Sequence, residues 1–558
     1  MKTIIKTTLS LVLLALLSGC ASNNGIDEYT LDSVNSNWYN TFKSYRNDTG
    51  TVDPIADLRI YQVMVESFQN GDDSINFDTG YGTSSHKGDL QGIINAIPYI
   101  KSLGMNAIWM TPVFRTVPDG QTPSKLDATG YYIYDYFNVE PRFGTNEKLK
   151  ELIDTAHKNG LYVFLDGVFG HFRSDVITKS PKGNTLHMTG KCIGSNLQPY
   201  NPPENTSCTD FDTNGDSEKF MTEVATHYIE NYKIDGWRLD QAYQVPLDTW
   251  RHIKKAVENT SASVTYKASV TYKDSNGKDV HPLGYMVGEI WSDNPTMAKT
   301  GYGPNKNPAL DSCFDFGLRY GIVQTLATEE WGKQNHSALN LIDLLKYDEN
   351  NLPSHAYPNL MITNHDLVRF GDLIQRAGLQ DSYDKRVDLA LSYLAIAHSG
   401  PITNYYGEEI GQDVPNFDKK RNEMGYYDDH VARDNGKIAN FTDKELQHQR
   451  LFTYLMKLRA QHGAISNGKM ELLKIRGSLF SCRKTFKRDD TFFYLMNLDK
   501  SNVAKITISN ELFAKDKGLK ALISSSPAVK NADGSYTVTV APLSFEVVTD
   551  GEAKGFYE

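Results

Sequence analysis

The feature that most constrains this chain is the regular alternation of short apolar runs with helical segments between residues 58 and 406. The apolar runs are Leu58–Val65, Asn106–Met110, Leu161–Leu165, Ile234–Leu239, Tyr285–Val287, Cys313–Phe316, Asn359–Ile362 and Ile402–Tyr406. Strand-like runs separated by helical patterns are typical of parallel β/α units. Eight such units predict a (β/α)8 TIM barrel, so the expected fold class is α/β.

Two further stretches indicate additional domains. Residues 171–215 are rich in Pro, Asn, Thr and Gly and are too long for a plain loop, so we expect a small excursion domain after the third strand. From residue 466 onward, short alternating strands such as Thr491–Asn497 and Tyr536–Val540 predict a C-terminal antiparallel β-sandwich over 466–558. The barrel is then expected over 53–170 and 216–465.

The N-terminus has the features of an export signal. Lys2 and Lys6 precede an apolar run, Leu9–Leu17, that is too short to span a bilayer as a stable helix. The following Leu-Ser-Gly-Cys20 resembles the bacterial lipobox, in which the cysteine becomes the lipidated first residue of the mature protein. An ordinary small-residue cleavage site is the alternative. The pattern predicts a lipoprotein signal peptide over 1–20 and a polar tether over 21–52.

The expected location follows from this anchor. The two residues after Cys20 are Ala and Ser, and the absence of Asp there favours the outer membrane in many Gram-negative bacteria. We therefore expect a cell-envelope lipoprotein that meets the membrane through its lipid alone.

The net charge of the chain excludes nucleic acid as a partner. The chain has 58 Lys and Arg against 68 Asp and Glu, a net charge of −10, so it lacks the basic surface that nucleic-acid binding requires.

Export to an oxidising compartment permits a disulfide, and Cys192 and Cys208, in one loop-like segment, are the predicted pair. Cys313 and Cys482 lie in strand-like contexts and are expected to be buried free thiols.

Charged and hydrogen-bonding side chains gather at the carboxyl ends of four predicted strands. A single Asp at a strand–helix junction is usually a helix cap or a turn residue. Four junctions that each deliver a carboxylate are harder to explain in that way, and in a barrel they converge on one mouth. The residues are Asp166 and His171, Arg238 and Asp240, Glu289, and Asn364, His365 and Asp366.

Cleavage of a glycosidic bond requires a set of this kind. One carboxylic acid protonates the leaving oxygen, and one carboxylate attacks or assists at the anomeric carbon. A site for a hard cation is the competing interpretation, but it would cluster oxygen ligands at one point instead of spreading them over four strands with an Arg among them.

Over roughly residues 55–550 the chain resembles the α-amylase superfamily, glycoside hydrolase family 13. The motifs that carry the resemblance are Asp166-Gly-Val-Phe-Gly-His171, Gly236-Trp-Arg-Leu-Asp240, Gly288-Glu-Ile-Trp291 and Thr363-Asn-His-Asp366, in the order of the family. Supporting pieces are Gly130-Tyr131-Tyr132 and Tyr405-Tyr-Gly-Glu-Glu409.

The resemblance implies a role for each motif residue. Asp240 would be the nucleophile, Glu289 the acid and then the base, and Asp366 the residue that stabilises the distorted sugar. Arg238 would keep Asp240 ionised and aimed. The remaining expected substrate-binding residues are His171 and His365 as hydrogen-bond donors to the sugar, Tyr131 as a stacking ring and Asp166 as an orienting group.

The implied activity is a retaining hydrolase of α-1,4-glucosidic bonds in starch, glycogen or maltodextrins. A transglycosylase or a maltose/trehalose isomerase on the same fold is the alternative, and a non-catalytic glucan-binding lipoprotein is a third. The last would lack one of the three carboxylates, and all three are present. After Asp240 the segment Gln241-Ala-Tyr-Gln244 departs from typical endo-acting amylases, which leaves endo or exo action open.

Calcium is the one metal that the resemblance suggests, and the chemistry itself needs no cofactor. Gly170 stands where many relatives have an Asn that binds calcium, which counts against that particular site. A second candidate site resembles a calcium loop of maltodextrin-acting relatives, because its oxygen ligands alternate along the chain. It comprises Asn70, Asp72, Asn76 and Asp89.

Overall fold

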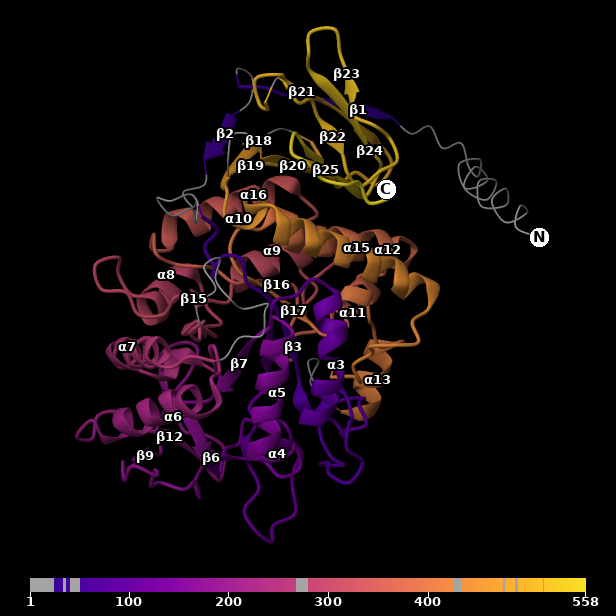
Figure 1. Ribbon diagram of the computed structural model, residues 1–558. Coiled ribbons are helices and arrows are strands. Elements are labelled where there is room, and N and C mark those ends of the chain that lie inside the picture. Colours follow the sequence, from indigo (N-terminus) through magenta and orange to yellow (C-terminus); the bar gives the residue numbers. More distant parts are fainter. Residues whose placement is uncertain are drawn as a thin grey trace.

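The computed structural model describes residues 25–33, 37–40, 51–266, 280–425, 433–474, 477–486, 490–514 and 516–558. A barrel forms the body, the excursion lies on one flank, and a β-sheet domain covers one end (Figure 1). The predicted signal peptide over 1–20 and its lipidation site, Cys20, lie outside the described residues. Within the described ranges, no helix is long and apolar enough to cross a membrane.

Eight parallel strands form the predicted barrel, and each overlaps its predicted run. They are β3 (Arg59–Val63), β4 (Ala107–Met110), β7 (Tyr162–Gly167), β13 (Gly236–Leu239), β14 (Tyr285–Gly288), β15 (Ser312–Cys313), β16 (Leu360–Met361) and β17 (Ile402–Tyr405). Their spatial order is β15-β14-β13-β7-β4-β3-β17-β16. A parallel bridge between Phe314 and Asn359 joins the two end strands, so the sheet closes on itself.

Alternate residues of these strands pack in two different places. Ile60, Trp109, Phe164 and Tyr285 belong to a core inside the barrel. The intervening residues pack outward against the helices. This alternation is the ordinary period of two of a β-strand, and it decides which side chains at the strand ends point into the barrel mouth.

Some of the helices around the barrel begin at a residue whose side chain caps the first turn. Asp89, Thr145 and Asp315 each accept a hydrogen bond from a backbone N–H of the first helical turn, which satisfies donors that have no partner inside the helix. The longer helices are α3 (Leu90–Ser102), α5 (Asn146–Lys158), α6 (Asp216–Tyr232), α7 (Leu247–Ser263), α9 (Phe316–Leu326), α10 (Ala338–Asn351), α11 (Phe370–Arg376), α12 (Tyr383–Ser392), α13 (Phe417–Met424) and α15 (Asp443–Gln461). Shorter helices are α2 (Val65–Phe68), α4 (Lys125–Ala128), α8 (Asn294–Met297) and α16 (Gly463–Ser466).

The excursion after β7 contains small antiparallel sheets. Strands β8 (His171–Arg173), β12 (Thr206–Thr209) and β9 (Met188–Thr189) form one, and β10 (Cys192–Ile193) and β11 (Pro199–Tyr200) form another. Cys192 and Cys208 are joined by a disulfide, as expected from the sequence, with Cα atoms 5.4 Å apart. The disulfide therefore links the two sheets. Cys313 and Cys482 are buried and free. A separate hairpin pairs β5 (Phe114–Arg115) with β6 (Asp135–Val139).

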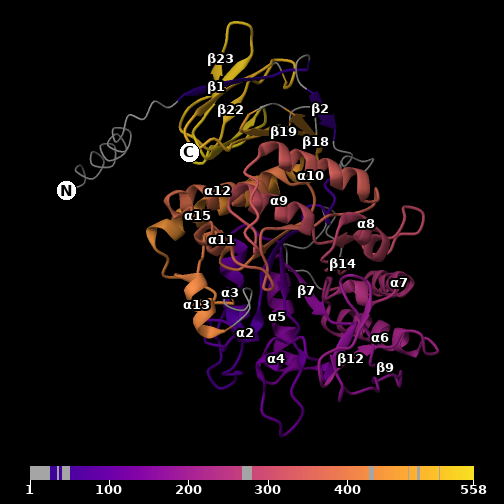
Figure 2. The same cartoon turned by 180° about the vertical axis from the view of Figure 1, so that it is seen from behind.

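The C-terminal domain is a sandwich of two sheets. The six-stranded sheet has the order β2-β18-β19-β20-β25-β22, and the four-stranded sheet has the order β1-β21-β24-β23. Figure 2 shows this domain above α10 and α12, which contact β19 and β25 respectively. The strands are β1 (Ile26–Leu31), β2 (Asn37–Asn40), β18 (Lys469–Lys474), β19 (Leu479–Thr485), β20 (Thr491–Asn497), β21 (Val503–Ile508), β22 (Lys520–Ala521), β23 (Val529–Lys530), β24 (Tyr536–Val540) and β25 (Ser544–Thr549).

The prediction of a polar tether over residues 21–52 is wrong for β1 and β2. Strand β1 pairs in parallel with β21 over six residues, and β2 pairs antiparallel with β18. The prediction failed because β1 is an edge strand in which three of the six residues are exposed, and only Leu31 is fully buried. A segment with so few apolar residues resembles a linker in sequence, although its backbone completes a sheet.

We predict that Leu31→Ala lowers the stability of the C-terminal domain by about 2–4 kcal/mol, because it removes a side chain from the core between the two sheets. Ile26→Ala in the same strand is the matched control, since Ile26 is 64% exposed, and it should change little. Thermal unfolding of both variants, followed by circular dichroism, measures the difference. Equal midpoints for the two variants would show that β1 contributes no core contact.

Candidate active site

The predicted catalytic carboxylates lie at the ends of neighbouring strands, where the backbone ladder fixes their positions. Strand β13 pairs with β14 so that Leu239 lies opposite Gly288, which places Asp240 and Glu289 next in the register. The Asp240 N–H donates to the Gly167 carbonyl (3.0 Å), and the Glu289 N–H donates to the Leu239 carbonyl (2.8 Å). Since the core residues Tyr285 and Val287 face the barrel interior, Glu289 follows them in the strand alternation and also faces inward.

One guanidinium holds three carboxylates together at the barrel mouth. Arg238 Nη1 donates to Asp166 Oδ1 (2.8 Å) and to Asp240 Oδ1 (2.9 Å). Its Nη2 lies 3.1 Å from Glu289 Oε2. Arg238 and Asp166 are fully buried, and Asp240 and Glu289 are each 6% exposed. A buried cation is stable only when it is paired in this way.

Burial raises the pKa of all three carboxyl groups. It brings the pKa of Asp166 to about 6 and those of Asp240 and Glu289 to about 7, while the charge of Arg238 acts in the opposite direction. Arg238 lowers the pKa of Asp240, in the direction that was expected, but burial raises it more strongly. Asp240 receives a direct hydrogen bond from Arg238, whereas Glu289 receives one from the Gln241 N–H (2.9 Å). The Arg238 charge acts on both groups, and its direct hydrogen bond to Asp240 favours Asp240 as the carboxylate and Glu289 as the acid.

A chain of hydrogen bonds runs from Gln62 through His365 and Tyr131 to Asp166, one of the three carboxylates. Gln62 Nε2 donates to His365 Nδ1 (2.8 Å), so the ring proton is on Nε2, which lies 2.7 Å from Tyr131 Oη. The Tyr131 hydroxyl donates in turn to Asp166 Oδ2 (2.7 Å). Burial lowers the pKa of His365 to about 3, so its ring is neutral. Tyr131 stacks on this imidazole, with 5.3 Å between the ring centres.

A cavity of about 780 Å³ opens in front of the three predicted catalytic residues, a size within the usual range for small-molecule sites. Tyr131 and His171, two of the residues expected to bind substrate, also line it. The other three residues expected to bind substrate lie behind the wall: Asp166 and Arg238 have no exposed surface, and His365 is 1% exposed. They position the groups that face the cavity.

Several residues of the cavity wall were not assigned a role from the sequence. Arg433 is one of them: its Nη2 donates to Asp366 Oδ1 (3.1 Å), and its Nε donates to the His365 carbonyl (2.9 Å). No predicted strand end or quoted motif stands beside it in the sequence, so no local signal indicated it. Trp291 ends a quoted motif and could have been found. The others are Tyr81, Leu126, Thr129, Ser195, Gln241 and Tyr243.

The loop predicted to bind calcium comprises Asn70, Asp72, Asn76 and Asp89, and hydrogen bonds hold part of it. The Asp89 carboxylate accepts backbone N–H groups of Gly71 and Asp72 (2.9 Å each) and also caps α3. Asp72 Oδ1 accepts from the hydroxyl and N–H of Ser74. Calcium takes about six to eight oxygen ligands. In the described part of the chain, no group of three or more His, Cys, Asp or Glu could hold a metal. Calcium binding stays a prediction, and we derive no step from it.

Comparisons with known proteins agree with this geometry. AmyP, whose crystal structure contains maltose, is 42% identical, with a TM-score of 0.80 over 91% of this chain and 99% of AmyP. The cyclomaltodextrinase of Thermoanaerobacter pseudethanolicus is 26% identical over 83% of this chain and 74% of its own length. The maltogenic α-amylase of Bacillus acidopullulyticus is 26% identical over 80% and 70%.

The profile of the α-amylase catalytic domain matches residues 62–183 and 204–451. These ranges contain the barrel strands from β3 to β17 almost completely and part of the excursion. They also contain the three carboxylates that meet Arg238, together with Asp366. The chain therefore belongs to the α-amylase family of glycoside hydrolases.

Proposed function

We propose that this enzyme is a retaining α-glucan hydrolase that cleaves α-1,4-glucosidic bonds of starch, glycogen or maltodextrins. The observation that carries the proposal is the arrangement of Asp240 and Glu289 on adjacent strands around one guanidinium, with Asp366 on the same cavity. The AmyP structures with maltose and with maltotriose support an α-glucan as the ligand class.

The geometry supports Asp240 as the nucleophile. Among the described residues, Asp240 Oδ1 is held by Arg238 and Oδ2 accepts no hydrogen bond. Oδ2 therefore keeps its lone pairs for attack on the anomeric carbon, and the leaving oxygen takes the proton of Glu289. A water molecule then gives a proton back to Glu289 and opens the glycosyl ester, which restores both carboxyl groups.

We also propose that the mature protein is a lipoprotein of the cell envelope, anchored through Cys20. The support is the basic, apolar and Leu-Ser-Gly-Cys order of residues 1–20.

The lipid anchor predicts incorporation of labelled palmitate when the full-length chain is expressed in a Gram-negative host. Cys20→Ala should remove the label and release the enzyme from the membrane fraction, whereas Ser22→Ala should keep both. Equal labelling of Cys20→Ala and the parent chain would rule the anchor out.

We predict that Glu289→Gln lowers kcat by about 10²–10⁴-fold with little change in glucan affinity, because the amide keeps the shape of the acid but has no proton to transfer. Steady-state kinetics on maltoheptaose and calorimetric binding of the same ligand measure the two effects. Glu151→Gln, on an exposed part of α5, is the matched control and should behave as the parent enzyme. A fully active Glu289→Gln variant would remove Glu289 from the acid role.

The retaining mechanism predicts that the new reducing end first appears as the α-anomer. NMR of the anomeric protons during the first minutes of maltoheptaose cleavage, before mutarotation, makes the assignment. A β-anomer in the first spectra would contradict the assignment of Asp240 as nucleophile. The same reaction on maltotriose separates hydrolysis from transfer, since a transglycosylase would accumulate longer oligosaccharides instead of reducing ends.

A further inference from the structure

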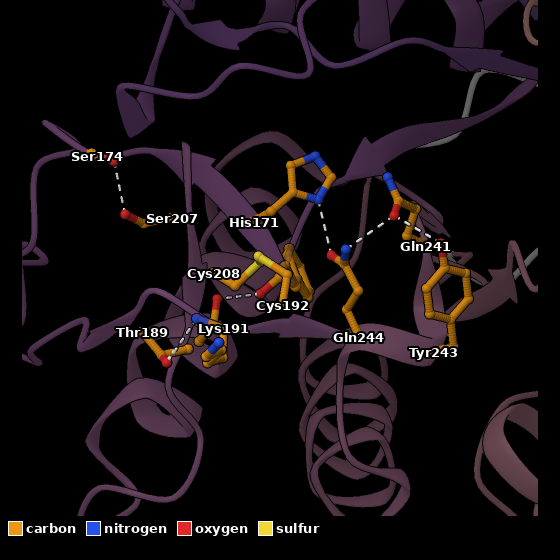
Figure 3. Close-up of a disulfide and its surroundings, with 12 residues drawn as sticks. His171, Ser174, Thr189, Lys191, Cys192, Ser207, Cys208, Gln241, Tyr243 and Gln244 are labelled. Carbon is orange, nitrogen blue, oxygen red and sulfur yellow. Dashed lines mark hydrogen bonds between the residues drawn. A yellow bond between two sulfur atoms is a disulfide. The ribbon is translucent and has the colours of Figure 1, made fainter. Parts of the chain in front are cut away.

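Gln244, on the short helical turn after β13, connects the excursion to the catalytic cluster. Its Oε1 lies 2.9 Å from His171 Nδ1, and its Nε2 donates to Gln241 Oε1 (3.0 Å) (Figure 3). An amide oxygen only accepts hydrogen bonds, so His171 must carry its proton on Nδ1. Tyr243 fixes Gln241 from the other side, because its hydroxyl donates to the same Oε1 (2.8 Å).

Gly170 makes room for this contact. A Cβ atom built at position 170 would lie 2.3 Å from Gln244 Oε1 and 2.5 Å from Gln244 Cβ. Gly170 does not have a positive φ, so the requirement for glycine there is one of space. A side chain at position 170 and the present position of Gln244 exclude each other.

The same hydrogen-bond network extends to Glu289, the proposed acid. Gln241 has a left-handed backbone conformation (φ 39°), and its N–H donates to Glu289 Oε2. Hydrogen bonds therefore run from His171 through Gln244 and Gln241 to Glu289.

We propose that Gln244 is a positioning residue that keeps the His171 proton on Nδ1, so that Nε2 presents a lone pair to the cavity beside Asp240. That lone pair accepts a hydrogen bond from a hydroxyl group of the sugar bound there. This inference rests on the proposed glucan hydrolysis for its ligand, and it replaces the expectation that His171 donates a hydrogen bond to the sugar.

The charges around His171 explain why a neutral partner belongs at position 244. His171 Nε2 lies 3.7 Å from Asp240 Oδ2, and the charges of Glu289 and Arg238 also act on the ring. Burial lowers the pKa of His171, so the ring is neutral at neutral pH. A protonated His171 would donate to Asp240 Oδ2 and occupy the oxygen that attacks. A carboxylate at position 244 would favour that charged form, whereas the amide of Gln244 carries no charge.

The tautomer can be measured without any substrate. In enzyme labelled with ¹⁵N-histidine, the His171 signal is assigned by its loss in His171→Asn. We expect the Nδ1–H form in the parent enzyme and a mixture of tautomers, or the Nε2–H form, in Gln244→Met, which keeps the length but not the acceptor. An Nε2–H form in the parent enzyme would overturn the proposal, and this result would not depend on whether glucan is the substrate.

The pH profile tests the consequence for the reaction. Gln244→Glu should raise the pKa of His171, so kcat/KM on maltoheptaose should fall at least tenfold at pH 6 and recover as the pH rises and the ring loses its proton. Gln91→Glu on α3 adds the same charge at a residue that does not line the cavity, beside Lys148, and should keep the parent profile. A Gln244→Glu profile that coincides with the parent profile would contradict the proposal.

A double-variant cycle tests the link to Gly170. Gly170→Ala should shift the His171 tautomer and lower kcat/KM when Gln244 is present. In a Gln244→Gly background, where the blocking side chain is absent, Gly170→Ala should have little further effect. Additive losses in the two variants would show that Gly170 and Gln244 act independently.

Discussion

The buried guanidinium of Arg238 is the interaction on which the catalytic centre depends. Burying a charge is costly unless opposite charges surround it, and here Asp166, Asp240 and Glu289 do so. They come from three adjacent strands whose parallel register brings their ends together. Because burial raises the pKa of all three carboxyl groups and the single cation offsets it only in part, the cluster can hold a proton near neutral pH, which is what an acid catalyst beside a nucleophile requires.

The excursion completes the cavity by bringing His171 to its rim. His171 begins β8, and its register partner on β12 is Cys208, which forms the disulfide with Cys192. Ser195, just beyond β10, also lines the cavity. The part of the wall that the excursion forms is therefore cross-linked by the disulfide, and a hydrogen bond between Gln244 and His171 helps to connect it to the barrel. Precise positioning of reacting groups can lower an activation barrier by about 7–11 kcal/mol.

The C-terminal domain shows how a fold can recruit a segment from the far end of the chain. Strand β1 forms one edge of the four-stranded sheet that also contains β21, β24 and β23. Strand β2 forms one edge of the six-stranded sheet. Lys484 fixes this domain to the barrel region by donating to the carbonyls of Ile396, His398 and Ile465 (2.6–2.9 Å). The first and last parts of the described chain therefore depend on each other for their packing.

The sequence by itself determined the eight strands, the excursion and the carboxylates Asp240, Glu289 and Asp366, because these depend on local apolar runs and on residues fixed next to strand ends. Tertiary structure decided what local patterns do not encode. It separated His365, buried behind the wall, from His171, which faces the cavity. It brought Arg433 to Asp366 and placed β1 in a distant sheet. Each of these depends on contacts between residues far apart in the chain, whose partners no local pattern specifies.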